Sequence, residues 1–267
     1  MARRLVWSSA AHSHVGMVRT VNEDACVELP SLGLWAVADG MGGHEAGDVA
    51  AQMIIDALRA VSPPPEWQDY IREVRRTLLR VNHRLREESA RRYQHRTIGS
   101  TVVVLLLRGN QMAVLWVGDS RIYRLRGNHL EQLTRDHSHV QDLVEQGLLT
   151  AQDAQHHPMA NVITRAVGSA DTLEIDCSSS AVLAGDVFLL CSDGLNKVIS
   201  DAEIQRVLSS RNSQKSVRAL IHSALLNGAN DNVTTAVVTV SEEEQTANDG
   251  EEKTVPTAEY LARQSQR

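Results

Sequence analysis

The sequence AVADGMGGHEAG, residues 36–47, leads an apolar run straight into a carboxylate. Residues 34–38 predict a buried strand, and Asp39 follows them without an intervening turn. Three glycines then fall within residues 40–43 and remove side-chain bulk around the carboxylate. Because glycine lets the backbone approach a ligand closely, this stretch indicates a binding site at the end of a core strand.

The same pattern recurs along the chain. VLWVGDSR leads an apolar run into Asp119, and VFLLCSDG leads another into Asp193. GANDNVTTAVVTV places Asp231 just before an apolar strand, and VRTVNEDA places Glu23 and Asp24 between two strand candidates. One such acid alone would be an ordinary turn residue. Several of them predict that carboxylates converge at one rim, provided that the strands share sheets.

Converging carboxylates predict a cation site. Ionised carboxylates repel one another, and holding them together without a cation is unfavourable. Oxygen ligands favour hard ions, so Mn²⁺ or Mg²⁺ is expected. Two such ions about 3.5–4 Å apart would suit three or four carboxylates and could activate a water between them.

Composition limits the classes of function. The 267 residues suffice for one large domain or two small ones, and the net charge of −6 argues against nucleic acid as the main partner. The longest apolar run, residues 102–107, is too short to cross a bilayer, so no membrane partner is expected. Since no secretory segment is recognised, Cys26, Cys177 and Cys191 predict reduced thiols in a cytoplasmic protein.

Short β-branched runs bounded by turn residues dominate the sequence. They predict strands near residues 16–20, 24–29, 33–38, 101–107, 112–117, 121–126, 172–176, 186–191 and 233–240. Amphipathic or apolar patterns predict helices over residues 45–60, 66–90 and about 214–227. Hairpin connections favour antiparallel sheets, and the paired helices favour sheet packed on sheet with helices outside.

Residues 136–170 differ from this plan. They form a polar segment with a short predicted helix near 138–146, which indicates a flap-like insertion over the surface. The segment contains His137, His139, His156 and His157. These histidines lack a Cys/His ligand grid and are therefore expected to be solvated loop residues.

Eight motifs, in order, resemble those of the PP2C (PPM) protein phosphatases. They are RTVNED (19–24), AVADGMGG (36–43), GSTVVVLLL (99–107), VGDSRIYR (117–124), LTRDHS (133–138), ITRAVG (163–168), LLCSDGL (189–195) and ANDNVTTAVV (229–238). The resemblance covers about residues 6–240, which would form the phosphatase domain. Residues 241–267 remain as an acidic tail that is expected to be disordered.

The resemblance implies both a fold and a reaction. The fold would be α+β, an α-β-β-α sandwich of two antiparallel sheets flanked by helices. The reaction would be hydrolysis of phosphoserine and phosphothreonine in proteins by a metal-activated water, with two tightly bound Mn²⁺ or Mg²⁺ ions and a weaker third.

The resemblance also assigns the metal ligands. Asp39 would bridge the two tightly bound ions. Asp193 and Asp231 would hold the first ion. Glu23 and the carbonyl of Gly40 would serve the second ion.

Three further residues receive roles by the same matching. Asp119, together with Asp193, would hold the third ion. Asp24 would support the ligands from behind. Arg19 would grip the substrate phosphate, since a guanidinium fork suits two phosphate oxygens.

One position departs from the animal members of the family. They carry a histidine, a proposed general acid, where this sequence has Met41. The residue that protonates the leaving group is therefore not assigned. His44 is an alternative, although a surface position at the start of a helix is the simpler interpretation.

The partners expected are phosphorylated proteins and a bacterial Ser/Thr kinase, such as one that controls a secretion system. A stand-alone monomer is expected. A catalytically silent relative is the first alternative, but it should have lost a ligand, and none is missing. A phosphatase for a regulatory protein such as an anti-sigma antagonist is the second, but it would usually carry a sensory domain. Cys191 is expected to be a core thiol, because neighbouring acids disfavour its thiolate.

Overall fold

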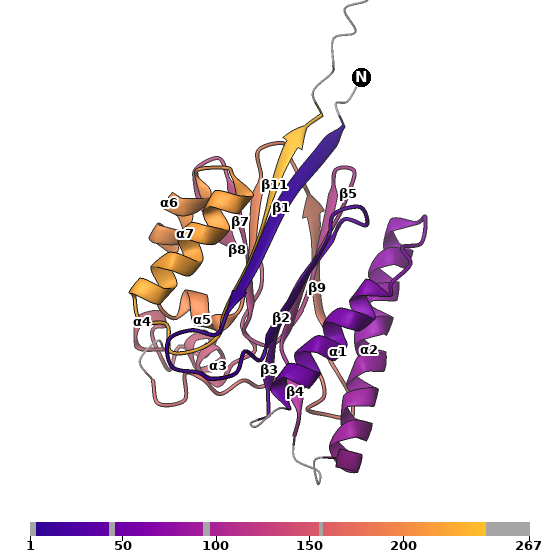
Figure 1. Ribbon diagram of the computed structural model, residues 1–267, viewed down its shortest axis with the longest axis vertical. Coiled ribbons are helices and arrows are strands. Elements are labelled where there is room, and N and C mark those ends of the chain that lie inside the picture. The colour runs from indigo at the N-terminus through magenta and orange to yellow at the C-terminus, as the bar shows by residue number, and fades with distance from the viewer. Residues whose placement is uncertain (1–3, 43–45, 93–96, 155–156, 244–267) are drawn as a thin grey trace, which may run out of the picture.

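The computed structural model describes residues 4–42, 46–92, 97–154 and 157–243. It has four layers, with two sheets stacked face to face and helices on both outer faces (Figure 1). The expected α-β-β-α sandwich is thereby confirmed. None of the described helices is both long and apolar enough to span a membrane.

The first sheet has the strand order β1-β11-β10-β7-β8. Its strands are β1 (Leu5–His14), β11 (Val233–Glu242), β10 (Val187–Cys191), β7 (Arg121–Arg126) and β8 (His129–Gln132). Its neighbouring strands pair antiparallel.

The second sheet has the order β2-β3-β5-β6-β9, and β4 pairs with β3. Its strands are β2 (Asp24–Leu29), β3 (Leu34–Met41), β5 (Val102–Arg108), β6 (Gln111–Val117), β9 (Asp176–Ala181) and β4 (Gly99–Ser100). These pairs are also antiparallel.

The helices cover the outer faces of the sheets. The second sheet is covered by α1 (Gly47–Arg59) and α2 (Trp67–Arg92). The first sheet is covered by α5 (Asp193–Asn196), α6 (Asp201–Leu208) and α7 (Ser213–Leu226). The two remaining helices are α3 (His139–Glu145) and α4 (Ala151–Ala154).

Strand alternation aims the acid of the opening stretch. On β3, Leu34 and Ala36 pack on the helix side of the sheet, whereas Trp35 and Val37 belong to the core between the sheets. Because successive side chains of a strand point to opposite faces, Asp39 follows Trp35 and Val37 into the layer between the sheets.

Three other strands bring polar side chains to the same end of this layer. These are Asp24 on β2, Thr101 before β5 and Ser192 after β10. Each lies two residues from a core side chain that faces the other sheet or packs against that core. Those core residues are Cys26, Val103 and Leu190. At this end of the sandwich, the apolar layer between the sheets therefore gives way to polar side chains.

Two predicted strands are wrong. Residues 16–20 form a turning segment, and the first strand is β1, which pairs along its whole length with β11. Gly16 has φ +82°, and a Cβ there would lie 2.1 Å from the carbonyl oxygen of Asp231, so the chain cannot continue as a regular strand. The strand expected at 172–176 begins instead at Asp176. The sequence pattern missed its position because the Ser-rich β9 is exposed and shows no apolar alternation.

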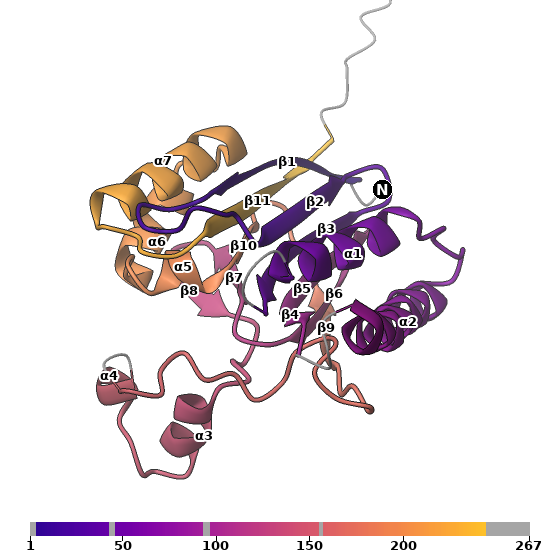
Figure 2. The same cartoon turned by 60° about the horizontal axis from the view of Figure 1, so that its bottom comes forward.

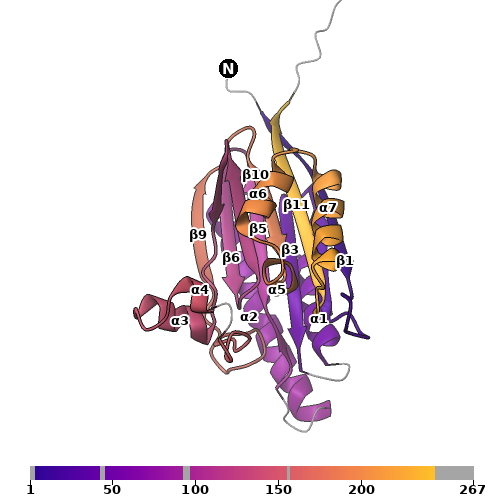
Figure 3. The ribbon, with the colours of Figure 1, turned by 90° about the vertical axis from the view of Figure 1, so that its left-hand side faces the viewer.

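The segment 136–170 contains α3 and α4 and projects from one end of the sandwich (Figures 2 and 3). The short helix predicted near 138–146 corresponds to α3. The predicted tail begins too early, because β11 continues to Glu242. The rest of the predicted tail, residues 244–267, lies outside the described residues, as do His44 and His156.

Gly118 is expected to be irreplaceable at the end of β6. It has φ +104°, and a Cβ there would lie 2.6 Å from the Cβ of Thr101. Gly118→Ala should lower the free energy of unfolding by roughly 2–4 kcal/mol, because backbone strain and steric overlap add. Gly109→Ala is the matched control, since Gly109 has φ +58° but open space around it. That change should cost only about 1 kcal/mol in denaturant titrations. Equal losses would rule out the packing argument.

Candidate active site

Asp24 and Asp39 lie directly opposite each other on paired strands. They are register partners across β2 and β3. Asp24 Oδ2 accepts a hydrogen bond of 2.7 Å from Ser192 Oγ, which ties the second sheet to the first. Ser192 Oγ in turn accepts a 2.9 Å bond from the Thr234 backbone N–H. The two sheets are thus joined at the end where the acids lie.

Thr101 fixes the backbone of Asp39. The Asp39 N–H donates to Thr101 Oγ1 at 3.1 Å, and the Thr101 N–H donates to the Asp39 carbonyl at 2.9 Å. Thr101 Oγ1 also lies 2.7 Å from Ser120 Oγ. Since Ser120 follows Asp119, this contact places buried Asp119 beside Asp39.

Asn232 anchors the segment between β1 and β2. Its Nδ2 donates to the carbonyls of Val15 and Val21 at 2.9 and 3.0 Å, and its Oδ1 accepts from the Glu23 N–H at 2.8 Å. The anchoring role of Asn232 was not predicted from the sequence, although Asn232 stands next to Asp231 within a quoted motif. The side-chain amide holds Glu23 against the strand start that carries Asp231.

Two cationic side chains contact the acids. Arg19 Nε lies 3.0 Å from Asp231 Oδ1, and its Nη2 donates to Oδ2 at 3.1 Å. Lys197 Nζ contacts Asp193 Oδ2 from one turn further along the chain. The sequence analysis did not assign Lys197 to the site, because its position relative to Asp193 follows from the short α5.

Gly40 and Gly47 allow Glu23 to reach the site. A Cβ on Gly40 would lie 2.0 Å from the Gly47 carbonyl oxygen and 2.7 Å from that of Glu23. A Cβ on Gly47 would lie 2.5 Å from Glu23 Oε1. The Glu23 carboxylate and the Gly40 carbonyl group therefore lie close together, in a place that only glycine leaves open.

Burial and like charge act together on Asp39. Burial is the largest cause of its raised pKa, followed by the negative charges of Asp24, Asp193, Asp119 and Asp231. These four acids therefore lie near enough to Asp39 for their charges to act on its carboxyl. Such a group is unfavourable when ionised without a cation.

The donor set fits divalent cations, although the acids do not surround a common point. Within the described ranges, no three His, Cys, Asp or Glu side chains form a ready-made metal group. Arg19 pairs with Asp231, and Lys197 pairs with Asp193. Two buried oxygens, Asp24 Oδ1 and Asp193 Oδ1, have no hydrogen-bond partner among the residues that the structure describes. Oxygen atoms of this kind suit Mn²⁺ or Mg²⁺, which would replace the two side-chain cations at Asp193 and Asp231.

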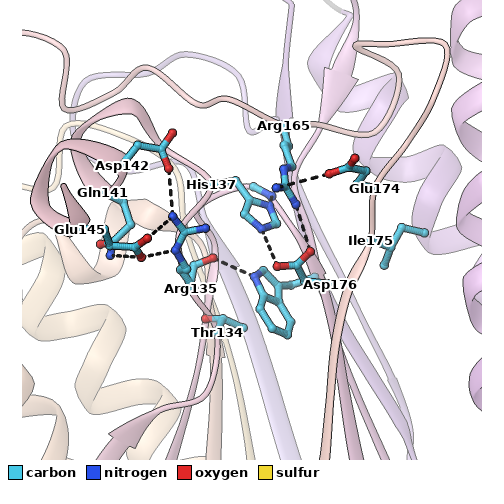
Figure 4. A network of polar contacts seen from close by, with 12 residues as sticks. Thr134, Arg135, His137, Gln141, Asp142, Glu145, Arg165, Glu174, Ile175 and Asp176 are labelled. Atoms are coloured by element: carbon cyan, nitrogen blue, oxygen red, sulfur yellow. Dashed lines mark hydrogen bonds and ion pairs between the residues drawn. The ribbon is translucent and has the colours of Figure 1, made fainter.

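The base of the segment 136–170 is fixed by His137 (Figure 4). Its Nδ1 accepts from the Gly118 N–H at 3.1 Å, and its Nε2 lies 3.3 Å from Asp176 Oδ2. Arg165 binds the other oxygen of Asp176 at 3.0 Å, and Trp116 stacks on the His137 ring. The expectation of a solvated histidine is wrong for His137, which is 1% exposed and whose pKa is lowered by burial.

Cys191 is the core thiol that the sequence predicts. It is fully buried in β10, and burial raises its pKa to about 12. A thiol in this state is not a nucleophile at neutral pH.

Comparison with known proteins gives a consistent result. A family model described as protein phosphatase 2C matches residues 10–238. The serine/threonine protein phosphatase PstP of Mycobacterium tuberculosis is 36% identical over 241 residues, which cover 90% of this chain and 46% of that protein. The chain thus spans about half the length of this relative.

Two solved structures are similar over most of the chain. One, described as "PppA, a key regulatory component of T6SS in Pseudomonas aeruginosa", is 48% identical with a TM-score of 0.82 and covers 88% of this chain and 98% of that one. The other is the catalytic domain of PstP in complex with two manganese ions. It is 34% identical with a TM-score of 0.81 and covers 89% of this chain and 100% of that one.

The acids should make metal-free stability depend on pH. The pKa of Asp24 and that of Asp119 are both raised to about 7, chiefly by burial and then by the charge of Asp193. A carboxyl with a raised pKa stabilises the fold at low pH, and this contribution is lost as pH rises from about 4 through about 7. Metal-free protein should therefore melt at a lower temperature at about pH 8 than at about pH 5, and Mn²⁺ should restore the melting temperature.

Asp24→Asn isolates this effect from other titrating groups. The amide cannot ionise, so the variant should lose less stability than the wild type over the same pH range. An identical pH dependence in the two proteins would show that Asp24 does not carry the effect.

Proposed function

This chain belongs to the protein phosphatase 2C family, and we propose that it hydrolyses phosphoserine and phosphothreonine in proteins with Mn²⁺ or Mg²⁺ as cofactor. One observation carries the proposal. The acids of four other sequence motifs, Asp24, Asp119, Asp193 and Asp231, act on Asp39 at one end of the sandwich, and Arg19 contacts Asp231.

The tightly bound ions would be held by five residues. Asp39 would bridge them, because the other acids lie around it. Asp193 and Asp231 would hold the first ion. Glu23 and the Gly40 carbonyl would serve the second, and their close approach through Gly47 supports this assignment.

The remaining acids have supporting roles. Asp119 and Asp193 would hold a weaker third ion, since the charge of Asp193 acts on the Asp119 carboxyl. Asp24 would orient the ligands from behind, because Ser192 and the strand pairing fix its position.

The reaction needs little from the protein beyond position and charge. When bound, the ions would lower the pKa of an attacking water and neutralise charge on the phosphoryl group. The Arg19 guanidinium, half exposed at the site, would bind two phosphate oxygens in exchange for Asp231. No protein nucleophile is required, in keeping with the inert thiol of Cys191.

The substrates would be phosphorylated proteins, and the protein would oppose a bacterial Ser/Thr kinase. The similarity to PppA supports a signalling role in regulation of a secretion system. We place the phosphatase domain at residues 6–240, with residues 136–170 as a flap, and expect a cytoplasmic monomer.

Asp39→Asn should abolish phosphatase activity, with a fall of at least about a hundredfold, because the amide removes charge where two ions meet. The metal-free variant should melt at a higher temperature than the wild type, since one repelling carboxylate is gone. Activity on para-nitrophenyl phosphate with Mn²⁺ and thermal melting measure the two effects.

Asp69→Asn is the matched control for Asp39. Asp69 lies at the start of α2 and forms only a surface ion pair with Arg72. It should retain wild-type activity. More than a tenth of the wild-type rate in Asp39→Asn would contradict the bridging role.

Arg19→Ala should raise KM for a phosphopeptide about tenfold and lower kcat less, because the guanidinium binds phosphate in both the ground state and the transition state. Arg72→Ala removes a half-exposed arginine of α2 and serves as control. An unchanged KM with reduced kcat would rule out a ground-state binding role for Arg19.

A further inference from the structure

Three large apolar side chains within two residues of Arg19 are exposed, and so is Leu226 at the end of α7. Met17 is 63% exposed, Val18 is 69% exposed, Val21 is 45% exposed and Leu226 is 73% exposed. We call these four residues the apolar rim. Clustered exposed apolar side chains on a soluble protein mark an interaction surface, whereas single ones need no explanation.

The two parts of the chain that carry the apolar rim lie side by side. The Met17 N–H donates to the Ala229 carbonyl at 2.8 Å, and the Ala229 N–H donates to the Ala224 carbonyl at 3.0 Å. The segment between β1 and β2 therefore runs beside the turn that follows α7 (Figures 1 and 2). Leu226, the last residue of α7, stands at this junction.

Hydrogen bonds within the chain order the backbone of the segment that carries Met17, Val18 and Val21. Asn232 binds the carbonyls of Val15 and Val21, and the Gly16 N–H donates to His14 Nδ1 at 3.0 Å. A surface that is already ordered loses little conformational entropy on binding. The backbone that carries Met17, Val18 and Val21 is thus held in place.

We propose that the apolar rim binds the residues that flank the phosphorylated side chain, and that this phosphatase favours substrates with a large aliphatic residue beside phosphoserine or phosphothreonine. The inference rests on the proposed function. Val18 is adjacent to Arg19, and Met17 and Val21 are two residues away. Since consecutive Cα atoms lie about 3.8 Å apart, a phosphate held by Arg19 would bring the neighbouring substrate residues over the rim.

Charge also favours an apolar occupant. Arg19 is the only charged residue in the segment 15–22, and its guanidinium is engaged by Asp231 or by phosphate. No other charge in that segment can select an acidic or basic neighbour. Selection there must come from burial of apolar area, which is worth about a factor of ten for one large side chain.

Two phosphothreonine peptides that differ only at the flanking positions test the proposal, one with leucine on both sides and one with serine. The wild-type protein with Mn²⁺ should show a KM about tenfold lower for the leucine peptide. The double variant Met17→Ser, Val18→Ser should bring the two KM values close together. Turnover of para-nitrophenyl phosphate, which has no flanking residues, should fall much less than turnover of the leucine peptide.

Leu183→Ser is the matched control, because Leu183 is 50% exposed but lies in the turn before β10 and outside the rim. It should keep the wild-type preference. Equal KM values for the two peptides in the wild type would overturn the inference and leave the phosphatase assignment intact. If neither peptide is hydrolysed, the proposed function fails and the inference fails with it.

Another occupant of the rim would give a different result. If the wild type sediments as a dimer and the double variant as a monomer, with no difference in peptide preference, the rim covers a second copy of the chain. That result would also overturn the inference.

Discussion

Repulsion among carboxylates at one end of the sandwich is the constraint on which the site depends. Burial raises the pKa of Asp39, and the negative charges of four other acids raise it further. The fold holds the group together by backbone and hydroxyl contacts rather than by attraction between the acids. Strand register fixes Asp24, Ser192 joins the two sheets, and Thr101 holds the backbone of Asp39. Ionising these neighbouring carboxyls without a cation is unfavourable, and bound divalent ions would relieve their repulsion.

Arg19 and Lys197 relieve part of that charge from within the chain. Each contacts one acid, and both are long side chains that can move without disturbing a strand. Under the proposed function, Arg19 would have a second partner in a substrate phosphate, so the same guanidinium would bind either Asp231 or substrate. The exchange would couple substrate binding to the state of the acids.

The sequence predicted that sheets stack between helices and that carboxylates converge at strand ends, because hairpin signals and strand-terminal acids are local features. A strand that alternates and then ends in an acid aims that acid predictably, as Asp39 illustrates. The sequence did not predict β1, whose serines and edge position weaken the pattern. It also missed Asn232 and Lys197 and misjudged His137. Those roles depend on contacts between segments far apart in sequence, or on how a short helix turns, which periodicity alone does not encode.

Calorimetric titration of metal-free protein with Mn²⁺ at about pH 7, in two buffers of different ionisation enthalpy, tests whether the acids exist to hold cations. Carboxyls with a raised pKa, among them that of the proposed bridging residue Asp39, carry protons in the metal-free protein and must release them when metal binds. Two tight binding events with proton release are expected. Absence of tight binding, or binding whose heat is the same in both buffers, would contradict this explanation of the site.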